Sequence, residues 1–151
     1  MARWADKLNI GDLWRRNCAD IISSLADAFE LTVPGSYPTG SYTPTLSNTT
    51  NVGASTAAET YYSRSGNNVT VYGALNVDPT ANTTLTELGI SLPIASDITN
   101  AQHVSGTASA IAFNSSGGIS GDTANNRATL TFISATDTNH TMRFHFTYRI
   151  V

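Results

Sequence analysis

Residues 142–150 read Met-Arg-Phe-His-Phe-Thr-Tyr-Arg-Ile and alternate strictly between apolar and polar side chains. This period of two is typical of a β-strand with one buried face. Six further stretches show the same alternation: 42–46, 60–64, 69–77, 88–92, 104–112 and 128–132. Turn signals at 65–68 and 136–139 separate neighbouring runs, and a longer loop at 114–118 leaves room for a short strand at Ile119. The pattern predicts a mainly β fold, an antiparallel β-sandwich or jelly-roll-like domain over residues 41–151.

The first thirty residues follow a helical period instead. Asn9 suits a helix N-cap and Asp12 suits the first turn, which predicts a helix from about residue 9 to residue 30. Its apolar stripe consists of Trp14, Cys18, Ile21, Ile22, Leu25, Ala28 and Phe29. An isolated amphipathic helix of this length is marginal in water, so the stripe must be covered. Three arrangements remain open: packing on the β domain, a short self-associating bundle, or insertion into a partner protein.

A Pro/Gly-rich segment separates the helix from the β domain. Residues 33–40 contain Pro34, Gly35, Pro38 and Gly40, a density that neither a helix nor a central strand accommodates. The sequence therefore predicts an N-terminal helical arm over residues 1–32, a hinge over residues 33–40, and a β head domain. The hinge favours an arm that stands away from the domain and serves as an anchor or oligomerisation device.

Composition excludes several classes of protein. Of 151 residues, 22 are Thr, 16 Ser and 13 Asn, whereas only 13% are charged, and the net charge is −3. An acidic, lysine-poor chain is unsuited to nucleic-acid binding through a basic face. We expect no membrane insertion, because no apolar run reaches about 18 residues. The N-terminus also lacks the apolar region of a signal peptide, so synthesis in a cytoplasm is expected.

Residues that could carry chemistry are few and scattered. His103, His140 and His145 do not stand at metal-ligand spacing, and Cys18 lies on the apolar stripe of the predicted helix. No nucleophile elbow or phosphate loop is present, and no carboxylate pair is evident, so we expect neither an enzyme nor a cofactor. No residue can be assigned to ligand contact from these patterns, and the roles of four arginines stay open: Arg64, Arg127, Arg143 and Arg149.

Four tyrosines have two interpretations. Tyr42, Tyr61, Tyr62 and Tyr72 could stack on sugar rings if they are exposed, or pack in the core and at the sheet edges. Two interpretations also apply to the small-residue strand at 104–112. Its Gly and Ala face indicates either close approach of another subunit or a tightly bent sheet within one chain.

Several stretches resemble the C-terminal β domain of fibre and head-fibre proteins in tailed-bacteriophage virions. They lie at residues 40–46, 51–56, 62–71, 77–80, 88–96 and 144–151. The block Leu-Gly-Ile-Ser-Leu-Pro-Ile-Ala-Ser at 88–96 and the Phe-x-Phe-x-Tyr-Arg ending carry most of the likeness. The resemblance covers about three-quarters of the chain and brings no catalytic residue with it.

The resemblance implies a structural virion protein. Such domains are commonly homotrimeric and distal, and the preceding segment attaches them to other virion proteins of the capsid or tail. The expectation is a short trimeric fibre or head-fibre subunit at the virion surface, held by its helix and contacting a host-surface glycan or protein. The alternative is a capsid decoration or cementing protein that stabilises the shell without binding a receptor.

Overall fold

The computed structural model describes residues 38–151, which form one compact, mainly β unit. The predicted arm, with Trp14, Cys18, Ile21, Ile22, Leu25 and Phe29, lies outside the described residues, as do Pro34 and Gly35 of the predicted hinge. The described strands are β1 (Thr39–Tyr42), β2 (Leu46–Thr50), β3 (Val52–Ala57), β4 (Thr60–Ser65), β5 (Asn68–Pro79), β6 (Leu85–Ile90), β7 (Val104–Ala110), β8 (Ser116–Asp122), β9 (Arg127–Ile133) and β10 (His140–Arg149). One short 3₁₀ helix, η1 (Ala101–His103), precedes β7.

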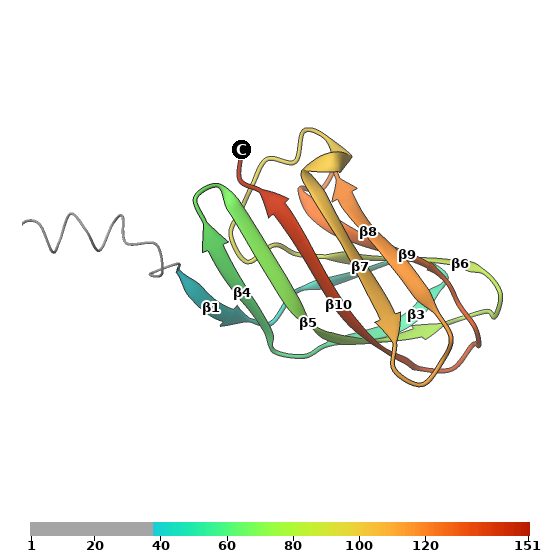
Figure 1. The fold of residues 1–151 in the computed structure, drawn as a ribbon. Coiled ribbons are helices and arrows are strands. Elements are labelled where there is room, and N and C mark those ends of the chain that lie inside the picture. Colours follow the sequence, from blue (N-terminus) through green and yellow to red (C-terminus); the bar gives the residue numbers. More distant parts are fainter. Residues whose placement is uncertain (1–37) are drawn as a thin grey trace, which may run out of the picture. The chain divides into compact units, whose positions relative to one another are not determined.

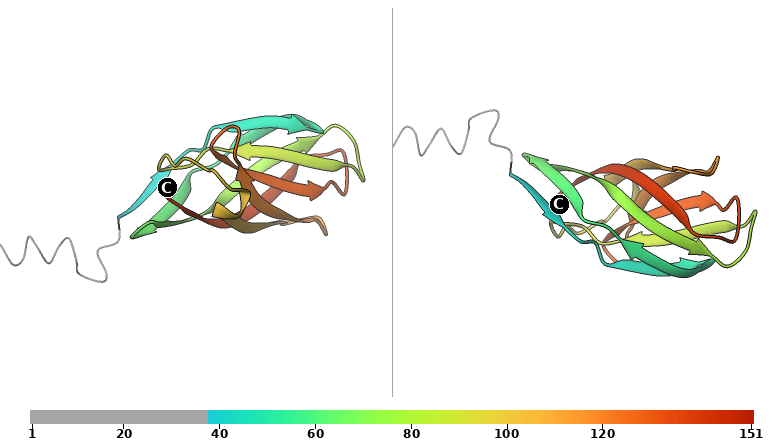
Figure 2. Two further views of the ribbon diagram at one scale, coloured as in Figure 1. Left: turned by 90° about the horizontal axis from the view of Figure 1, so that it is seen from above. Right: turned by 90° about the horizontal axis from the view of Figure 1, so that it is seen from below.

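All strand pairs are antiparallel and belong to one continuous sheet, which confirms the antiparallel β prediction. The order is β1-β4-β5-β10-β7-β8-β9-β6-β2, and β3 pairs with the second half of β5. Figure 1 shows β4, β5, β10 and β7 side by side, with β6 behind them. The sheet curls into a half-barrel, as the views in Figure 2 show, so its inner face can bury a core.

The core lies on one face of this curled sheet. Strand β10 follows the predicted period along its whole length, because Met142, Phe144, Phe146 and Tyr148 are buried and the intervening residues are exposed. Strand β5 contributes Val69, Val71, Leu75 and Val77 to the same face, as the sequence predicts. The paired central strands β5 and β10 therefore contribute one side of the core, against which other parts of the domain pack.

Asn51 holds the corner where the chain passes from β2 to β3. Its φ is 57°, in the left-handed region that Asn tolerates better than most residues. Its Nδ2 donates to the Ala81 carbonyl (3.0 Å) and the Thr86 hydroxyl (2.8 Å). Its Oδ1 accepts from the Thr80 hydroxyl and the Ala81 N–H, both at 2.8 Å. One side chain thus ties this corner to the segment that joins β5 to β6.

Five differences separate the observed strands from the predicted ones. The run predicted at 42–46 is divided, because Pro44 separates the end of β1 from the start of β2. Strand β3 is not predicted at all, and the strand expected near Ile119 is the full-length β8. The run at 88–92 ends as a strand at Ile90, while Thr39 and Gly40, expected in the hinge, belong to β1.

Close packing within the sheet accounts for the small-residue strand. A Cβ added to Gly106 would collide with the His145 carbonyl and with Phe146 on the neighbouring strand β10. Gly117 has little space for the same reason, since a Cβ there would lie 2.6 Å from the Thr131 carbonyl. These glycines permit tight curvature of β7, β8 and β9 within one chain. Bending of the sheet within one chain therefore explains the small residues of this strand without close approach of a second subunit.

Candidate functional site

The structure separates the four candidate tyrosines into two pairs. Tyr42 and Tyr62 are half-buried, pack against the core, and contact each other edge-on at a centroid distance of 6.2 Å. Tyr61 and Tyr72 point outward, with 46% and 52% of their surfaces exposed. Their rings stack at 5.9 Å with an interplanar angle of 28°. Exposed, paired aromatic rings provide an apolar surface edged by hydroxyl groups, which suits contact with the C–H face of a sugar.

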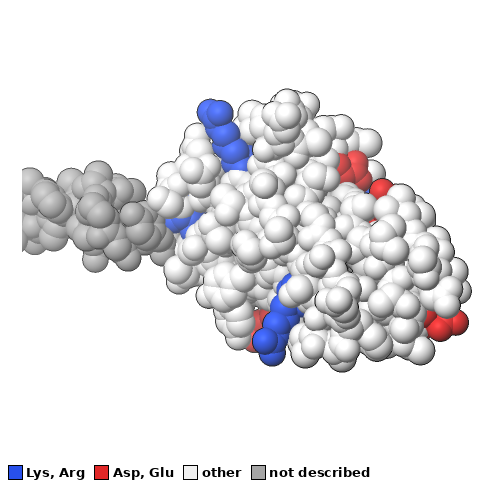
Figure 3. All heavy atoms as spheres, turned by 45° about the vertical axis from the view of Figure 1, so that its right-hand side comes forward, with Lys and Arg blue, Asp and Glu red and all other residues white. Residues whose placement is uncertain are grey.

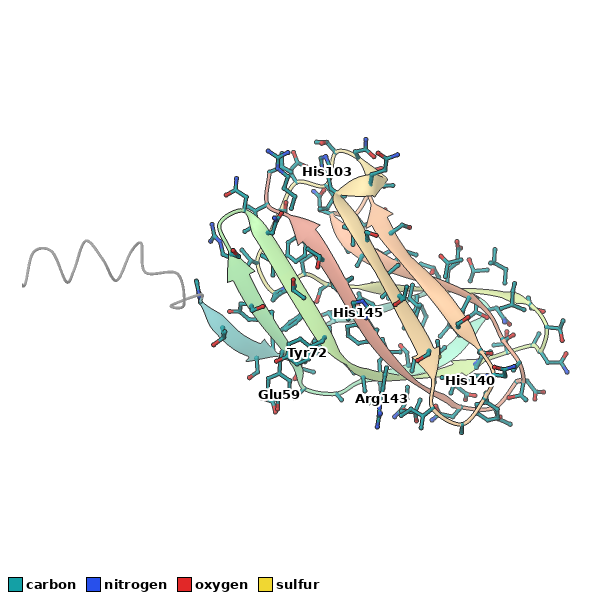
Figure 4. All side chains as sticks on the ribbon, in the orientation of Figure 1. Glu59, Tyr72, His103, His140, Arg143 and His145 are labelled. Carbon is teal, nitrogen blue, oxygen red and sulfur yellow. The ribbon has the colours of Figure 1, made fainter. Side chains whose placement is uncertain are left out.

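The two exposed rings begin a row that crosses the outer face of the sheet. Tyr61 of β4 lies opposite Tyr72 of β5, and Tyr72 lies opposite His145 of β10. His145 in turn faces Thr107 of β7, which faces Gly118 of β8. Figure 4 shows Tyr72 and His145 on this face of the sheet. We call Tyr61, Tyr72 and His145 the tyrosine shelf.

Arg143 flanks the shelf. It lies two residues before His145 on the same face of β10, opposite Ala74 of β5 and Ser109 of β7. Both neighbours are small, so they leave the guanidinium exposed (Figure 4). A guanidinium offers five N–H donors in a planar fork and stays charged at any working pH.

An open depression adjoins the shelf beside Arg143 and His145. It measures about 430 Å³ and is also lined by Thr107, Ser109, Ser116 and the edges of Ala108 and Phe144. Gly118 borders on open space, since a Cβ there would meet no atom within 4 Å. The depression is therefore a consequence of small side chains on β7 and β8 next to longer ones on β10.

The charges around the shelf are sparse. Figure 3 shows a surface that is mostly free of charged side chains, with a few isolated basic and acidic groups. Glu59 precedes β4, and its Oε2 accepts a hydrogen bond from the Tyr61 hydroxyl at 3.3 Å. The negative charge of Glu59 raises the pKa of Tyr61, so this hydroxyl stays protonated as a donor.

The structure assigns different surroundings to the four arginines. Arg64 donates to the Gly66 carbonyl (2.7 Å) and so supports the β4–β5 turn. Arg127 pairs with Asp122 at 2.8 Å and supports the β8–β9 turn. Within residues 38–151, no carboxylate lies within 4.0 Å of Arg143 or Arg149, which are both exposed on β10. Only Arg143 adjoins the tyrosine shelf.

The histidines are not brought together. His140 is fully buried, contacts Phe113 at a centroid distance of 4.5 Å, and places Nδ1 2.6 Å from the Thr138 carbonyl. His103 ends η1, and His145 belongs to the shelf. Among residues 38–151 no group of three His, Cys, Asp or Glu side chains is placed to hold a metal ion. The same part of the chain contains no helix with the length and apolarity to cross a membrane.

Comparison of the chain with protein-family models, with curated proteins and with solved structures gives no match in any of the three. Sequence reasoning identified Tyr61 and Tyr72 as candidates but missed His145 and Arg143 as their neighbours. The alternation in the last strand does place Arg143 and His145 on one polar face. It does not indicate that this strand pairs with β5, which is what brings them next to the tyrosines.

Proposed function

We propose that this chain is a structural virion protein of a tailed bacteriophage, a short trimeric fibre or head-fibre subunit. Its curled β domain serves as the sandwich-like head and contacts host-surface glycan, and its N-terminal helix anchors it to other virion proteins. The observation that carries the recognition role is the exposed, stacked pair Tyr61 and Tyr72. A folded domain gains little stability from two large rings that are half in water, so their position favours contact with a ligand.

Two further features support the proposal. The resemblance to fibre-type β domains covers the stretches that form β5, β6 and β10. The chain is rich in Thr, Ser and Asn and has only eight Lys and Arg residues, so it offers few sites to trypsin-like proteases. Both features fit a protein exposed on the outside of a particle.

The anchoring role is tested on the particle. The double substitution Ile21→Asp with Leu25→Asp places two charges on the predicted apolar stripe, which cannot then be buried. We expect virions that carry less than a tenth of the normal copy number, measured by quantitative mass spectrometry. Ser23→Asp with Ser24→Asp adds the same charge to the opposite face of the predicted helix and is expected to leave the copy number unchanged.

Particles lacking the protein distinguish the fibre from the decoration protein. Loss of adsorption to host cells with intact heat resistance supports the fibre subunit. Loss of heat resistance with normal adsorption supports a cementing role instead. The solution mass of the full chain by light scattering tests the trimer directly, and a monomer at micromolar concentration would refute self-association as an intrinsic property.

A further inference from the structure

We propose that the tyrosine shelf and the adjoining depression bind an acidic oligosaccharide, with sugar rings on Tyr61 and Tyr72 and a carboxylate on Arg143. This inference rests on the proposed glycan contact and specifies its chemistry. Three observations carry it: an arginine without a carboxylate partner among the described residues, hydroxyl groups without a hydrogen-bond partner among the same residues, and an extended open surface.

The first observation is the charge of Arg143. Its neighbours across β5 and β7 are Ala74 and Ser109, which cannot neutralise it. Glu59, at the other end of the shelf, interacts with the Tyr61 hydroxyl and not with Arg143. A carboxylate that approaches the depression can accept two N–H donors from the guanidinium, and such charge-assisted pairs are about twice as strong as neutral hydrogen bonds.

The second observation concerns the hydroxyl groups in the depression. Some hydroxyls elsewhere on the outer face are paired: the Thr70 and Thr147 hydroxyls lie 3.1 Å apart, and the Thr141 hydroxyl donates to Asn76 at 2.8 Å. The structure records no such bond for the Thr107, Ser109 or Ser116 hydroxyls with any described residue. These three groups stay available to sugar hydroxyls, for which they can act as donor or acceptor.

The third observation is the shape of the surface. The row from Tyr61 to Gly118 crosses five adjacent strands, or roughly 19 Å at about 4.8 Å per strand. The depression has the volume of a small-molecule site but is open, so it cannot enclose a ligand. An extended chain laid across the strands fits this shape, and a repeating saccharide would place rings and carboxylates at intervals along it.

The test is calorimetric titration of the full chain with two acidic probes, tetragalacturonate and tetrameric sialic acid, and with the methyl ester of tetragalacturonate. The ester keeps the sugar rings but removes the charge. We expect at least one acidic probe to bind at least tenfold more tightly than the ester. Millimolar concentrations of both acidic probes without any heat of binding would overturn the inference.

Arg143→Gln and Arg149→Gln form a matched pair, because both residues are exposed arginines on the same face of β10. Arg143→Gln is expected to weaken acidic-probe binding 10- to 100-fold while leaving ester binding unchanged. Arg149→Gln is expected to change binding less than threefold, as for a screened surface charge. Equal losses in the two variants would overturn the assignment of the carboxylate to Arg143. Melting temperatures equal to that of the wild type confirm that each variant is folded.

Tyr72→Ala separates this inference from the proposed function. We expect it to weaken binding of the acidic probe and the ester about equally, since the ring face does not sense the charge. Ester binding equal to that of the acid, with loss in Tyr72→Ala, would overturn the acidic preference and support glycan contact. Absence of binding to all three saccharides would overturn this inference, whereas the proposed host contact is tested independently by adsorption of particles lacking the protein, and virion anchoring by the substitutions at Ile21 and Leu25.

Discussion

Replacement of Tyr148 by Phe probes how the core strand β10 holds the segment after β6. The Tyr148 side chain is only 1% exposed. Its hydroxyl donates to the Ile94 carbonyl at 2.8 Å and accepts from the Ile94 N–H at 3.1 Å. Phe fills the same space, so the substitution removes two hydrogen bonds and creates almost no cavity.

The expected loss of stability follows from these two contacts. A hydrogen bond contributes about 1 kcal/mol net, and an unpaired buried group costs about 1–3 kcal/mol. Ile94 is half-buried, so water can reach its backbone in part. We therefore expect the free energy of unfolding of Tyr148→Phe to fall by about 2 kcal/mol at pH 7, measured by urea denaturation with circular dichroism.

The pH dependence supplies a second readout. Burial raises the pKa of Tyr148 to about 12, whereas the unfolded chain has the ordinary value near 10. A raised folded-state pKa means that the stabilisation is complete below pH 10 and is lost as pH rises through 12. Burial raises the pKa of Tyr42 in the same direction. The wild type should therefore lose stability steeply above pH 10, and Tyr148→Phe less steeply.

Tyr61→Phe is the matched control. It also removes one phenolic hydroxyl, but from a side chain that is 46% exposed. We expect a change of less than about 0.5 kcal/mol at pH 7, as for other surface substitutions. If Tyr148→Phe has the stability of the wild type at pH 7 and loses stability above pH 10 as steeply as the wild type, the Tyr148 hydroxyl does not fix the segment after β6.

Three further predictions concern the curled sheet and its turns. Gly106→Ala should lower the free energy of unfolding by about 2–3 kcal/mol, because its Cβ meets the β10 backbone, whereas Gly118→Ala faces open space and should cost less than about 0.5 kcal/mol in urea denaturation. Asn51→Ala should cost about 2–4 kcal/mol in the same assay, because it removes the corner hydrogen bonds and strains a positive φ. Hydrogen bonds from Asn125 and Arg127 lower the pKa of Asp122, so its contribution is present above about pH 4 and lost below it. The stability difference between wild type and Asp122→Asn, about 1 kcal/mol at pH 7, should shrink progressively as the pH falls below about 4 in pH-dependent thermal melts.

The central strands were predictable because their alternation reflects burial on one face. Strands β5 and β10 are long and pair with each other over ten residues. Strand β10 buries every second residue, so its period of two is strict, and β5 departs from the period only at the partly buried Gly73. Strand β3 escaped prediction because its sequence, Val-Gly-Ala-Ser-Thr-Ala, contains no alternating large apolar residues. It pairs with β5 near the corner and buries no side chain completely, so burial imposes no pattern on it.

The pairing of two of the three residues of the tyrosine shelf could also have been predicted from the sequence. The predicted turn at 65–68 forms, with Gly66 at a φ of 59°, as a tight hairpin requires. A two-residue turn fixes the register, so Ser65 opposite Asn68 places Tyr61 opposite Tyr72. His145 joins the row from more than seventy residues away, through a pairing between β5 and β10 that no local turn specifies. Long-range strand pairing is set by the packing of the whole core, which alternation alone does not encode.

The alternation along the strands places the core and the proposed binding surface on opposite faces of the sheet. On β10, Phe144 and Phe146 are buried while Arg143 and His145 point outward, so the shelf can change without removing core volume. An open surface excludes little water and gains little from enclosure, and a single shelf is therefore expected to bind weakly. In the proposed trimer, three shelves on one particle would raise the effective concentration of the remaining sites after the first contact. A weak acidic-saccharide interaction in the monomer is for this reason compatible with firm attachment, and the saccharide titration and the solution mass together determine whether avidity explains it.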